Sequence, residues 1–494
     1  MTLSGNRLPN QERKMESKEF TAALWSLSPN VIEDPNETLG MLTFKRDELL
    51  ILEIPAGVLL DWPKIPIEGG YMQSHTADGL HADQVYGFSQ NGDYYLLREV
   101  SSPGPGISCP GMEKQTLRGT SLFVSREPLE ANPVVKSITV KFPGLREWLG
   151  VIPFDVSMKF ECNRVSSIDF KCDLTKANSI ILFENDEIEI SINLINIHKG
   201  GPTPSYSFEF ETDCEMEISF KKEESNFDDC MERWVHNAIS FLAFCTGFKY
   251  SIDNLIIETS KGVKAEYYAL FVGAPGAPVF SQLQSMPFPY QKIKEKISIM
   301  ISNWYGFDSY LRNSSTLLTS LMNKWNMPLD MLFLASAQAF EAASRSGVDE
   351  CEISEDDLRE RLEAIKNSDL KSTFKKWACY KLKYARWRSA NSLAKELIRK
   401  LDGFAAYVVP DSNRFLKDHR THRDAYTHRR SLSESESLSN EELYYHMEAV
   451  QLLTYGAIAL NVGLEPNEIV AYFEESRYRW YCFYRSRKQY AAAE

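Results

Sequence analysis

The chain has 494 residues, of which 43 % are hydrophobic and 25 % charged, so it is long enough for two or three domains with ordinary buried cores. This balance excludes an intrinsically disordered protein, and the formal net charge of −13 argues against a protein that binds nucleic acid over its whole surface. No run approaches the roughly 18 apolar residues of a membrane span, and no apolar signal core follows Met1, so we expect no membrane partner and a cytoplasmic location.

After a polar tail at residues 1–20, the first half of the chain predicts short strands separated by Gly, Pro, Asn and Asp. Residues 39–53 predict two strands around a polar turn, and the Asn-Gly pair at 91–92 between aromatic runs is typical of a hairpin. Residues 187–195 alternate isoleucine with polar residues, the period of a half-buried strand. We therefore expect a β-rich, sandwich-like or barrel-like domain over residues 21–270. Further strands are expected at residues 121–125, 137–142, 156–162, 179–183, 205–210 and 255–258.

The second half predicts helices. A Pro- and Gly-rich piece at residues 271–290 indicates a linker, and residues 291–494 are then almost entirely helical. Residues 329–344 are apolar almost all round, which favours a central buried helix. A polar helix is expected at residues 411–430, and the Ser-x-x-Glu pattern at 439–442 is typical of a capping box that opens the next helix. Further helices are expected at residues 228–246, 354 onward, 371–385, 386–402 and 443–462.

The nine cysteines are scattered, and no Cys-x-x-Cys pair occurs. An odd number without such pairs signals neither a disulfide framework nor a cysteine-based zinc site. We therefore expect a reducing compartment, which agrees with the cytoplasm, and no bound metal or other cofactor.

Basic residues gather in one segment of this acidic chain. Residues 371–430 hold 16 Lys and Arg against 5 Asp and Glu, a net charge of +11. Since the whole chain has a net charge of −13, the rest of the chain has a net charge of −13 − 11 = −24. This basic segment indicates a confined site for an anionic partner. The alternative is a set of ordinary solvated helix faces.

Within this segment, Arg423 and His428 pair an obligate cation with a proton-transfer group. Arginine can hold a phosphate with a fork of N–H donors, and histidine can move a proton near neutral pH. Asp424 is suited to orient either of them. The set suggests cleavage of RNA with the RNA's own 2′-hydroxyl as nucleophile. Chance predicts about 0.4 such Arg-x4-His matches, and the second match, Arg414 with His419, is interpreted as structural or as a peripheral RNA contact.

Helix geometry restricts how the two residues can meet. Positions i and i+5 point about 140° apart around an ideal helix axis, so one intact helix cannot direct Arg423 and His428 at a single phosphate. Either the helix ends between them, or a second subunit supplies the partner group. A two-fold homodimer would bring two copies of the motif face to face.

Three other features remain open. Glu341, in the apolar helix, is expected to form a salt bridge with some arginine of the bundle or, more specifically, to hold Arg423 in place. The tail at 477–490 interleaves arginine with aromatic residues, which suits either base stacking or burial. The histidines at 419, 422 and 428, like His75 and His81, lack the spacing of metal ligands, so no metal is expected.

These residues resemble a known family, the Apea-like HEPN proteins. Residues 423–428 resemble the family's Arg-[Asn/Asp/His]-x-x-x-His motif, with Asp424 in the polar second position. The apolar helix at 333–344 resembles the family helix that carries a glutamate, here Glu341. The first half resembles the family's N-terminal β-rich domain at residues 24–30, 40–44, 85–97, 145–150 and 234–247.

The resemblance implies an α+β multidomain protein in which a β-rich domain precedes an all-α HEPN bundle, and a role in abortive antiphage defence. We expect a metal-independent endoribonuclease, with tRNA one candidate substrate, that leaves a 2′,3′-cyclic phosphate. Arg423, Asp424 and His428 are the expected catalytic residues, and Glu341 their support. The β-rich domain is expected to restrain the nuclease or to sense a phage-encoded protein. The residues expected to contact RNA are Lys417, Arg420, His422, Arg429 and Arg430.

Two alternatives belong to other classes. The helical domain could bind a nucleotide or RNA without cutting it, as an adaptor. A weaker alternative is a carbohydrate-binding or scaffold protein built on the β-rich domain, in which Arg423 and His428 are only structural. Cellular RNA compared between the wild type and His428→Ala separates the nuclease from both.

Overall fold

The computed structural model divides the chain into two compact units that alternate along the sequence. The β unit comprises Met1–Leu145, Leu174–Val235 and Ser251–Ala277, and the helical unit comprises Arg146–Asp173, His236–Tyr250 and Pro278–Glu494. Residues 271–285 of the predicted linker lie outside the described part of the chain. The structure describes residues 18–19, 22–44, 50–61, 64–67, 70–73, 79–102, 106–108, 112–142, 144–150, 154–161, 164–172, 179–199, 209–222, 226–248, 252, 254–269, 286–322, 327–349, 351–428, 430–433, 435–476 and 479–491.

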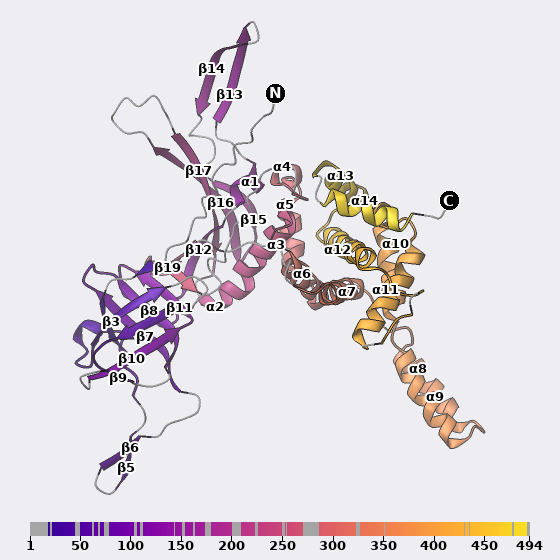
Figure 1. The fold of residues 1–494 in the computed structure, drawn as a ribbon, viewed down its shortest axis with the longest axis horizontal. Helices are drawn as coiled ribbons and strands as arrows, with labels where there is room; N and C mark the ends of the chain where they lie inside the picture. Colours follow the sequence, from indigo (N-terminus) through magenta and orange to yellow (C-terminus); the bar gives the residue numbers. More distant parts are fainter. Residues whose placement is uncertain are drawn as a thin grey trace. The chain divides into compact units, whose positions relative to one another are not determined.

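A closed barrel forms the first part of the β unit (Figure 1). Its six strands pair in the order β8-β7-β2-β3-β4-β10, and a pairing of Arg118 in β10 with Ser101 in β8 closes the ring. Closure removes the unpaired edges of an open sheet. The barrel strands are β2 (Ala23–Ser26), β3 (Thr38–Phe44), β4 (Leu50–Ile54), β7 (Leu80–Ser89), β8 (Tyr94–Ser102) and β10 (Met112–Gly119).

Trp25 fills the barrel and is fully buried. Its indole N–H donates to the carbonyl oxygen of Gly40 at 3.3 Å, which satisfies the one polar atom of the ring. A Cβ on Gly87 would lie only 2.8 Å from the indole ring, so the absence of a side chain at residue 87 makes room for it. The barrel core is thus built around one large aromatic residue, with leucine, isoleucine and valine side chains around it.

The sheet continues from the barrel into an antiparallel extension. Strand β11 (Ser121–Ser125) pairs with β8 on one side and with β19 (Lys264–Ala269) on the other. The order then runs β19-β18-β12-β17-β16-β15. The new strands are β12 (Val135–Lys141), β15 (Ser179–Glu184), β16 (Ile188–Lys199), β17 (Glu209–Phe220) and β18 (Asn254–Thr259). The shorter elements of the first half are β1 (Lys18–Glu19), β5 (Lys64–Ile67), β6 (Gly70–Gln73), β9 (Gly106–Ser108), β13 (Phe154–Glu161), β14 (Arg164–Cys172), the 3-10 helix η1 (Val31–Glu33), α2 (Phe227–Cys230) and the π-helix η2 (Met231–Val235).

Most predicted strands are confirmed. The Asn-Gly hairpin joins β7 to β8, and Gly92 has a φ of +81°, the conformation for which glycine is favoured. Ile188, Ile190 and Ile192 are buried on one face of β16, as their alternation predicts. The strand predicted at 205–210 falls mostly on residues outside the described part, since β17 begins at Glu209.

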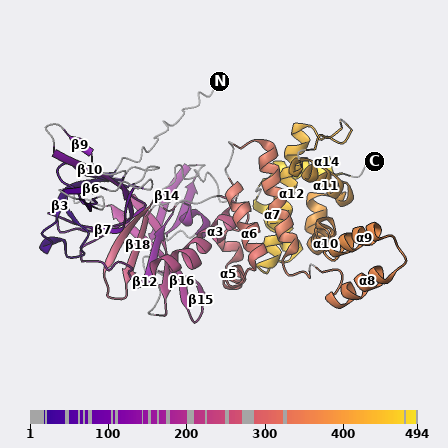
Figure 2. The same cartoon turned by 90° about the horizontal axis from the view of Figure 1, so that it is seen from below.

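The helical unit is built around α12 (Asn440–Asn461), which contacts α6, α7, α10, α13 and α14. Figure 2 shows the same helices from a second side. The expected capping box is present, because Ser439 and Glu442 satisfy each other's backbone N–H groups. The other helices are α1 (Leu145–Leu149), α3 (His236–Thr246), α4 (Tyr290–Ile293), α5 (Ile297–Tyr305), α6 (Ser309–Leu321), α7 (Leu329–Arg345), α8 (Glu355–Asn367), α9 (Ser372–Ala385), α10 (Ala390–Val408), α11 (Ser412–Thr427), α13 (Pro466–Ser476) and α14 (Trp480–Gln489).

The central helix is not the one that the apolar pattern favours. In α7 one face is buried, through Phe333, Ala337 and Phe340, while Met331 is 52 % exposed. In α12 almost every residue from Leu443 to Ala459 is buried, although the sequence there includes His446, Glu448 and Gln451. The helix predicted at residues 329–344 is therefore present as α7, but the expectation that it is buried on all sides is wrong, because small apolar residues such as alanine tolerate partial exposure to water. Among the described residues, no helix is long and apolar enough to cross a membrane.

Candidate functional site

Helix α11 carries the Arg-x4-His motif. Its first turn is capped by Asp411, whose side-chain oxygen accepts the N–H of Arg414 at 2.9 Å. Phe415, His419 and His422 are buried on one side of the helix, which packs against α7 and α10. Burial of that side fixes the orientation of α11 and leaves the polar residues of the motif on its less buried sides.

Glu341 of α7 holds Arg423 in a bidentate ion pair. The Arg423 Nε–H donates to Oε1 at 2.6 Å, and Nη2–H donates to Oε2 at 3.0 Å. Nη1–H donates to Asp424 Oδ1 at 3.0 Å. The two interpretations considered for Glu341 therefore coincide, because its salt-bridge partner in the bundle is Arg423.

These contacts set the charge and the free donors of Arg423. The hydrogen bond to Glu341 is the main cause that raises the pKa of Arg423, so its guanidinium is permanently charged. A guanidinium has five N–H donors, and the three contacts use one on each nitrogen. Within the described part of the chain, one N–H on each terminal nitrogen is left to bind an anion.

A cavity of about 360 Å³ opens beside this ion pair. Three helices supply its walls: Glu341 comes from α7, Ala390 and its neighbours from the start of α10, and the remaining residues from α11. Ser389 caps α10 there, accepting the N–H of Ser392 at 3.1 Å. The lining residues are Glu341, Ser389, Ala390, Asn391, Ala394, Leu416, His419, Arg420, Arg423 and Asp424.

His428 lies at the end of α11 and outside the residues that line the cavity. It is the C-cap residue, its backbone N–H donates to the Asp424 carbonyl oxygen at 3.0 Å, and its side chain is exposed. The helix thus ends between Arg423 and His428, which is one of the two arrangements expected from the spacing. The structure brings Arg423, Asp424 and Glu341 together and leaves His428 open to solvent.

The residues expected to contact RNA fall into four groups. Arg420 is exposed and lines the cavity. Lys417 and Arg430 are exposed outside it. Arg429 lies outside the described residues. His422, by contrast, is only 1 % exposed.

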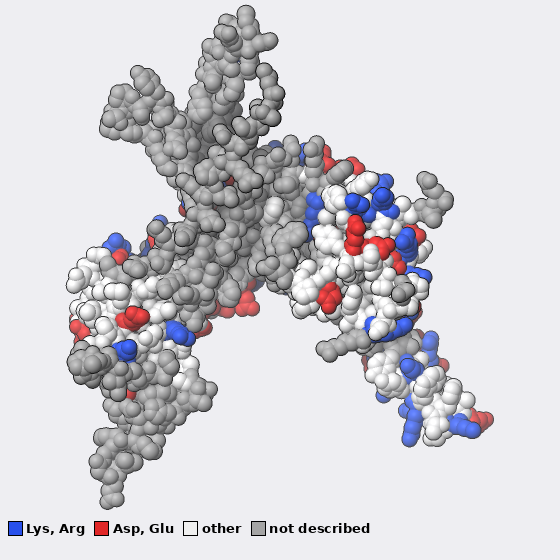
Figure 3. Space-filling view, viewed as in Figure 1, with Lys and Arg blue, Asp and Glu red and all other residues white. Residues whose placement is uncertain are grey.

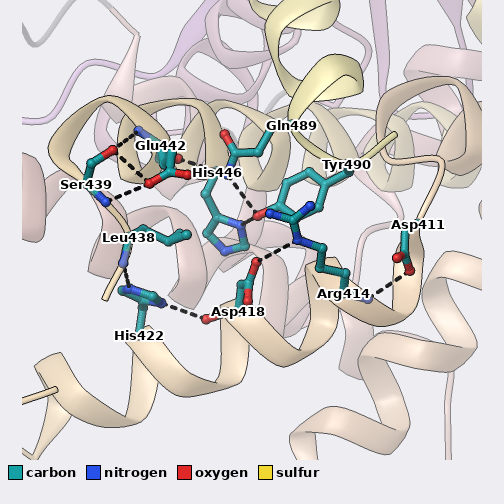
Figure 4. Close-up of polar contacts among 10 residues, drawn as sticks. All are labelled: Asp411, Arg414, Asp418, His422, Leu438, Ser439, Glu442, His446, Gln489 and Tyr490. Atoms are coloured by element: carbon teal, nitrogen blue, oxygen red, sulfur yellow. Dashed lines mark hydrogen bonds and ion pairs between the residues drawn. The ribbon is translucent and has the colours of Figure 1, made fainter. Parts of the chain in front are cut away.

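Both ring nitrogens of His422 are engaged inside the protein (Figure 4). The N–H of Leu438 donates to Nε2 at 3.1 Å, so the ring proton is on Nδ1 and donates to the Asp418 carbonyl oxygen at 3.0 Å. His422 therefore links α11 to the segment before α12, and neither nitrogen is available to a ligand.

The same view explains part of the aromatic tail. Tyr490 is fully buried, its hydroxyl bonds His446, and its carbonyl oxygen accepts the N–H of Asp411 at 2.8 Å. Tyr481 and Tyr484 of α14 are in contrast about half exposed, at 51 % and 53 %. The tail thus uses at least its last aromatic residue for packing against the start of α11.

His419 is the cavity residue whose role sequence reasoning underestimates. Its side chain is 6 % exposed, and neither ring nitrogen has a hydrogen-bond partner within the described structure. Burial lowers its pKa to about 4, and the charge of Arg423 adds to this effect. A neutral imidazole with a donor and an acceptor therefore lines the cavity. The second Arg-x4-His match, at Arg414 and His419, is the sequence signal that marks it.

No group of three or more His, Cys, Asp or Glu residues that could hold a metal ion occurs in the described part of the chain. Cys245, Cys351, Cys379 and Cys482 have free thiols.

A barrel-containing β unit joined to a helical unit, with an Arg-x4-His motif at the end of a polar helix, defines the class of a β-domain protein with a HEPN-type helical domain. Comparison with family models agrees with this class. Residues 22–304 match ApeA N-terminal domain 1, and residues 334–468 match Apea-like HEPN. The chain therefore belongs to the ApeA family of HEPN proteins, a family of abortive-infection nucleases. No curated protein and no solved structure has significant similarity to the chain.

Proposed function

We propose that this protein is a metal-independent endoribonuclease that acts in the cytoplasm during antiphage abortive infection. One observation carries the proposal: Arg423 of the motif is held by Glu341 and Asp424 with two N–H donors left, at the wall of a cavity. A fixed cation with spare donors suits the charge that grows on a phosphoryl group during cleavage. Membership of an abortive-infection nuclease family supports the biological role.

In the proposed reaction, the 2′-hydroxyl of the RNA attacks the adjacent phosphorus atom. His428 removes the 2′-hydroxyl proton or protonates the departing 5′-oxygen. Arg423 binds the phosphoryl oxygens, and Asp424 keeps its guanidinium in place. The P–O5′ bond breaks as the new P–O2′ bond forms, so the products are a 2′,3′-cyclic phosphate and a 5′-hydroxyl.

A homodimer completes the proposed site. His428 is the C-cap residue of α11, four residues lie between it and Arg423, and it does not line the cavity beside Arg423. A second copy related by two-fold symmetry would supply the missing group. HEPN domains are commonly dimeric and act on RNA, which supports this arrangement.

Exposed basic residues near the motif extend the proposed RNA contact. Arg420 lines the cavity, and Lys417 and Arg430 are exposed on α11 and just after it. Each would pair with a phosphate of the RNA backbone, which gives affinity without sequence preference. Arg429 belongs to the same basic run, and tRNA is one candidate substrate. His422 is not included, because its ring is committed to internal hydrogen bonds.

The test compares purified wild type with His428→Ala on labelled RNA in the presence of EDTA. The wild type is expected to leave cyclic-phosphate ends, and the variant to leave the RNA intact. Thr427→Ala is the matched control, since Thr427 is the exposed neighbour at the same helix end and has no proton to exchange near neutral pH. Undiminished cleavage by His428→Ala would refute the role of this residue, and loss of wild-type cleavage in EDTA would indicate a metal nuclease.

We further propose that the β unit regulates the nuclease, either by restraint or by binding a phage-encoded protein. Replacing Trp25 by Ala in the full chain would empty the barrel core without touching the helical unit. Restraint predicts higher toxicity of this variant without phage, whereas sensing alone predicts unchanged basal toxicity and a lost response to phage. Leu39→Ala, at a barrel position 54 % exposed, is the control.

A second candidate function is a nucleotide-binding or RNA-binding adaptor that does not cut. The cavity volume of about 360 Å³ favours it, because this is the size of a small-molecule site and His428 does not line it. In that case Arg423→Gln would weaken the binding of a nucleotide, and no RNA cleavage would be detected with the wild type.

A further inference from the structure

Helix α9 and the segment that follows it leave large aromatic side chains in water. Tryptophan is normally among the well-buried residues, so a row of half-exposed aromatic rings marks an interaction surface. The exposed fractions range from 49 % to 62 %. The residues are Phe374, Trp377, Tyr380, Tyr384 and Trp387. We refer to these five as the aromatic row.

The aromatic row lies on a hairpin formed by α8 and α9, which extends away from the rest of the helical unit (Figures 1 and 2). The two helices contact each other, and Leu362, Ile365 and Leu382 are half-buried apolar residues of the hairpin. At its base, the N–H of Glu352 donates to the Arg386 carbonyl oxygen at 2.8 Å. One side of α9 is thus half-buried, through residues such as Leu382, and the aromatic row is on the more exposed side.

The rings are spaced and paired so that flat groups can stack on them. Intervals of three and four residues keep the first four rings along one side of α9, and Trp387 follows the helix. The ring centroids of Phe374 and Trp377 are 5.2 Å apart, and those of Tyr380 and Tyr384 are 4.7 Å apart. The rings of the two pairs are tilted to each other by 33° and 59°, and each ring is about half exposed, so unpaired bases can stack on the exposed part.

The charge of the same segment is strongly positive. Residues 371–388 contain seven Lys and Arg and no Asp or Glu. Lys381 lies four residues after Trp377 and three before Tyr384, within the aromatic row itself. Helix α8 has the opposite balance, with five acidic and three basic residues. Blue basic side chains accordingly project from this hairpin in Figure 3.

We infer that α9 is an RNA-docking arm, whose aromatic row stacks on bases of a single strand while its lysines follow the phosphates. The inference rests on the proposed function for its choice of RNA. A second copy of α9 fits less well, since two-fold pairing would face seven positive charges with seven more. A membrane surface also fits less well, because interfacial helices separate basic and apolar faces, and here Lys381 is within the row.

The test measures RNA binding in full-length protein that carries His428→Ala, so that the RNA probe is not cut during the measurement. The added change is Trp377→Ala with Tyr384→Ala, and the probe is a fluorescent single-stranded RNA followed by anisotropy. Loss of two stacking rings is expected to raise Kd by about tenfold or more. Ile299→Ala, which truncates an equally exposed apolar residue of α5, is expected to leave Kd unchanged. Melting temperatures of the variants identify any that do not fold.

Three outcomes overturn the docking arm: an unchanged Kd in the double variant, an equal loss of affinity for blunt duplex RNA, or loss of dimer mass in sedimentation. Binding of the parent protein to phosphatidylglycerol vesicles, abolished by the double variant, would assign the row to a membrane instead. The test distinguishes failure of the docking arm from failure of the nuclease proposal. If wild-type protein cuts no RNA but the double variant still loses RNA affinity, the nuclease fails and the docking arm stands.

Discussion

Glu341 acts in the proposed site through the orientation of Arg423. Its two oxygens hold one side of the guanidinium, and the remaining N–H donors are on the two terminal nitrogens. A phosphate that enters the cavity would therefore meet donors whose direction is fixed before it arrives, which is the condition for effective electrostatic stabilisation. Glu341 is thus a positioning residue in this scheme.

The variant Glu341→Gln tests that role. The amide keeps the size of the side chain, but it offers one oxygen and no negative charge, so Arg423 loses its bidentate support. Misplacement of a catalytic group by about 1 Å costs on the order of 100-fold in rate, so we expect kcat to fall by about this factor with a smaller change in KM. Stability should fall only modestly, because the pair is partly exposed, at 31 % and 19 %. Glu474→Gln, at an exposed position of α13, is the control, and a wild-type kcat for Glu341→Gln would contradict the positioning role.

His419 predicts how stability depends on pH. Its pKa is about 4 in the folded protein and about 6.5 in the unfolded chain, so the unfolded state binds the proton first. The neutral ring therefore contributes stability that is complete above pH 6.5 and is lost as the pH falls toward 4, by about 3 kcal/mol. Burial lowers the pKa of His446 as well, which adds loss in the same direction.

Urea unfolding at pH 7.5 and pH 4.5 measures this effect. His419→Leu, which cannot be protonated, is expected to lose less stability between the two pH values than the wild type does. His428→Ala should lose as much as the wild type, since His428 is exposed. An equal pH dependence in wild type and His419→Leu would show that His419 does not control it.

At the scale of elements, local signals in the sequence predicted the structure well where a few neighbouring residues decide it. The turn at Gly92 and the capping box at Ser439 are cases of this kind. The closure of the barrel between Arg118 and Ser101 was not predictable, because it depends on strand pairing rather than on either strand alone. The site shows the same division: Arg423 and Asp424 stand out in the sequence, while the burial of His422 follows only from packing around α11.

The packing of α10 against α12 depends on Gly456. In an isolated helix, Gly→Ala would stabilise by roughly 1 kcal/mol. Here a Cβ would lie 2.3 Å from the ring of Phe404, which is buried and cannot move aside easily. Overpacking of this kind costs about 1–3 kcal/mol, so Gly456→Ala is expected to lower the urea midpoint. Gly306→Ala is the control, since its nearest contacts would be 3.5 Å away. A higher midpoint for Gly456→Ala would mean that helix propensity outweighs the clash.

At the scale of the whole molecule, the two units are not consecutive pieces of the chain. Residues 236–250 belong to the helical unit, where Phe244 of α3 stacks on Tyr455 of α12 with ring centroids 4.8 Å apart. Trp148 also donates its indole N–H to the Phe288 carbonyl oxygen at 2.8 Å. Truncation near residue 290 would therefore remove part of the helical core. Function of the helical unit is better tested with substitutions in the full chain.

The proposed dimeric site makes a prediction about mixed assemblies. Arg423→Gln and His428→Ala should each be inactive alone. If Arg423 of one copy works with His428 of the other, an equimolar mixture that exchanges subunits regains one intact pair in each mixed dimer. Half of the dimers are mixed, and each mixed dimer has one intact Arg423–His428 pair where a wild-type dimer has two. Activity should therefore return to about a quarter of the wild-type activity. A pair formed within one chain predicts no recovery.

A second mixture separates these possibilities from simple dilution. A chain that carries both substitutions is mixed with wild type. In the mixed dimers, Arg423 and His428 are then both on the wild-type copy, so no pair can form between copies. Pairing between copies then leaves only the wild-type dimers active, about a quarter of the total activity, whereas pairing within a chain leaves about half. Cleavage rates of the two mixtures, measured on the same RNA after subunit exchange has been verified by mass, thus decide whether the motif is half of a site.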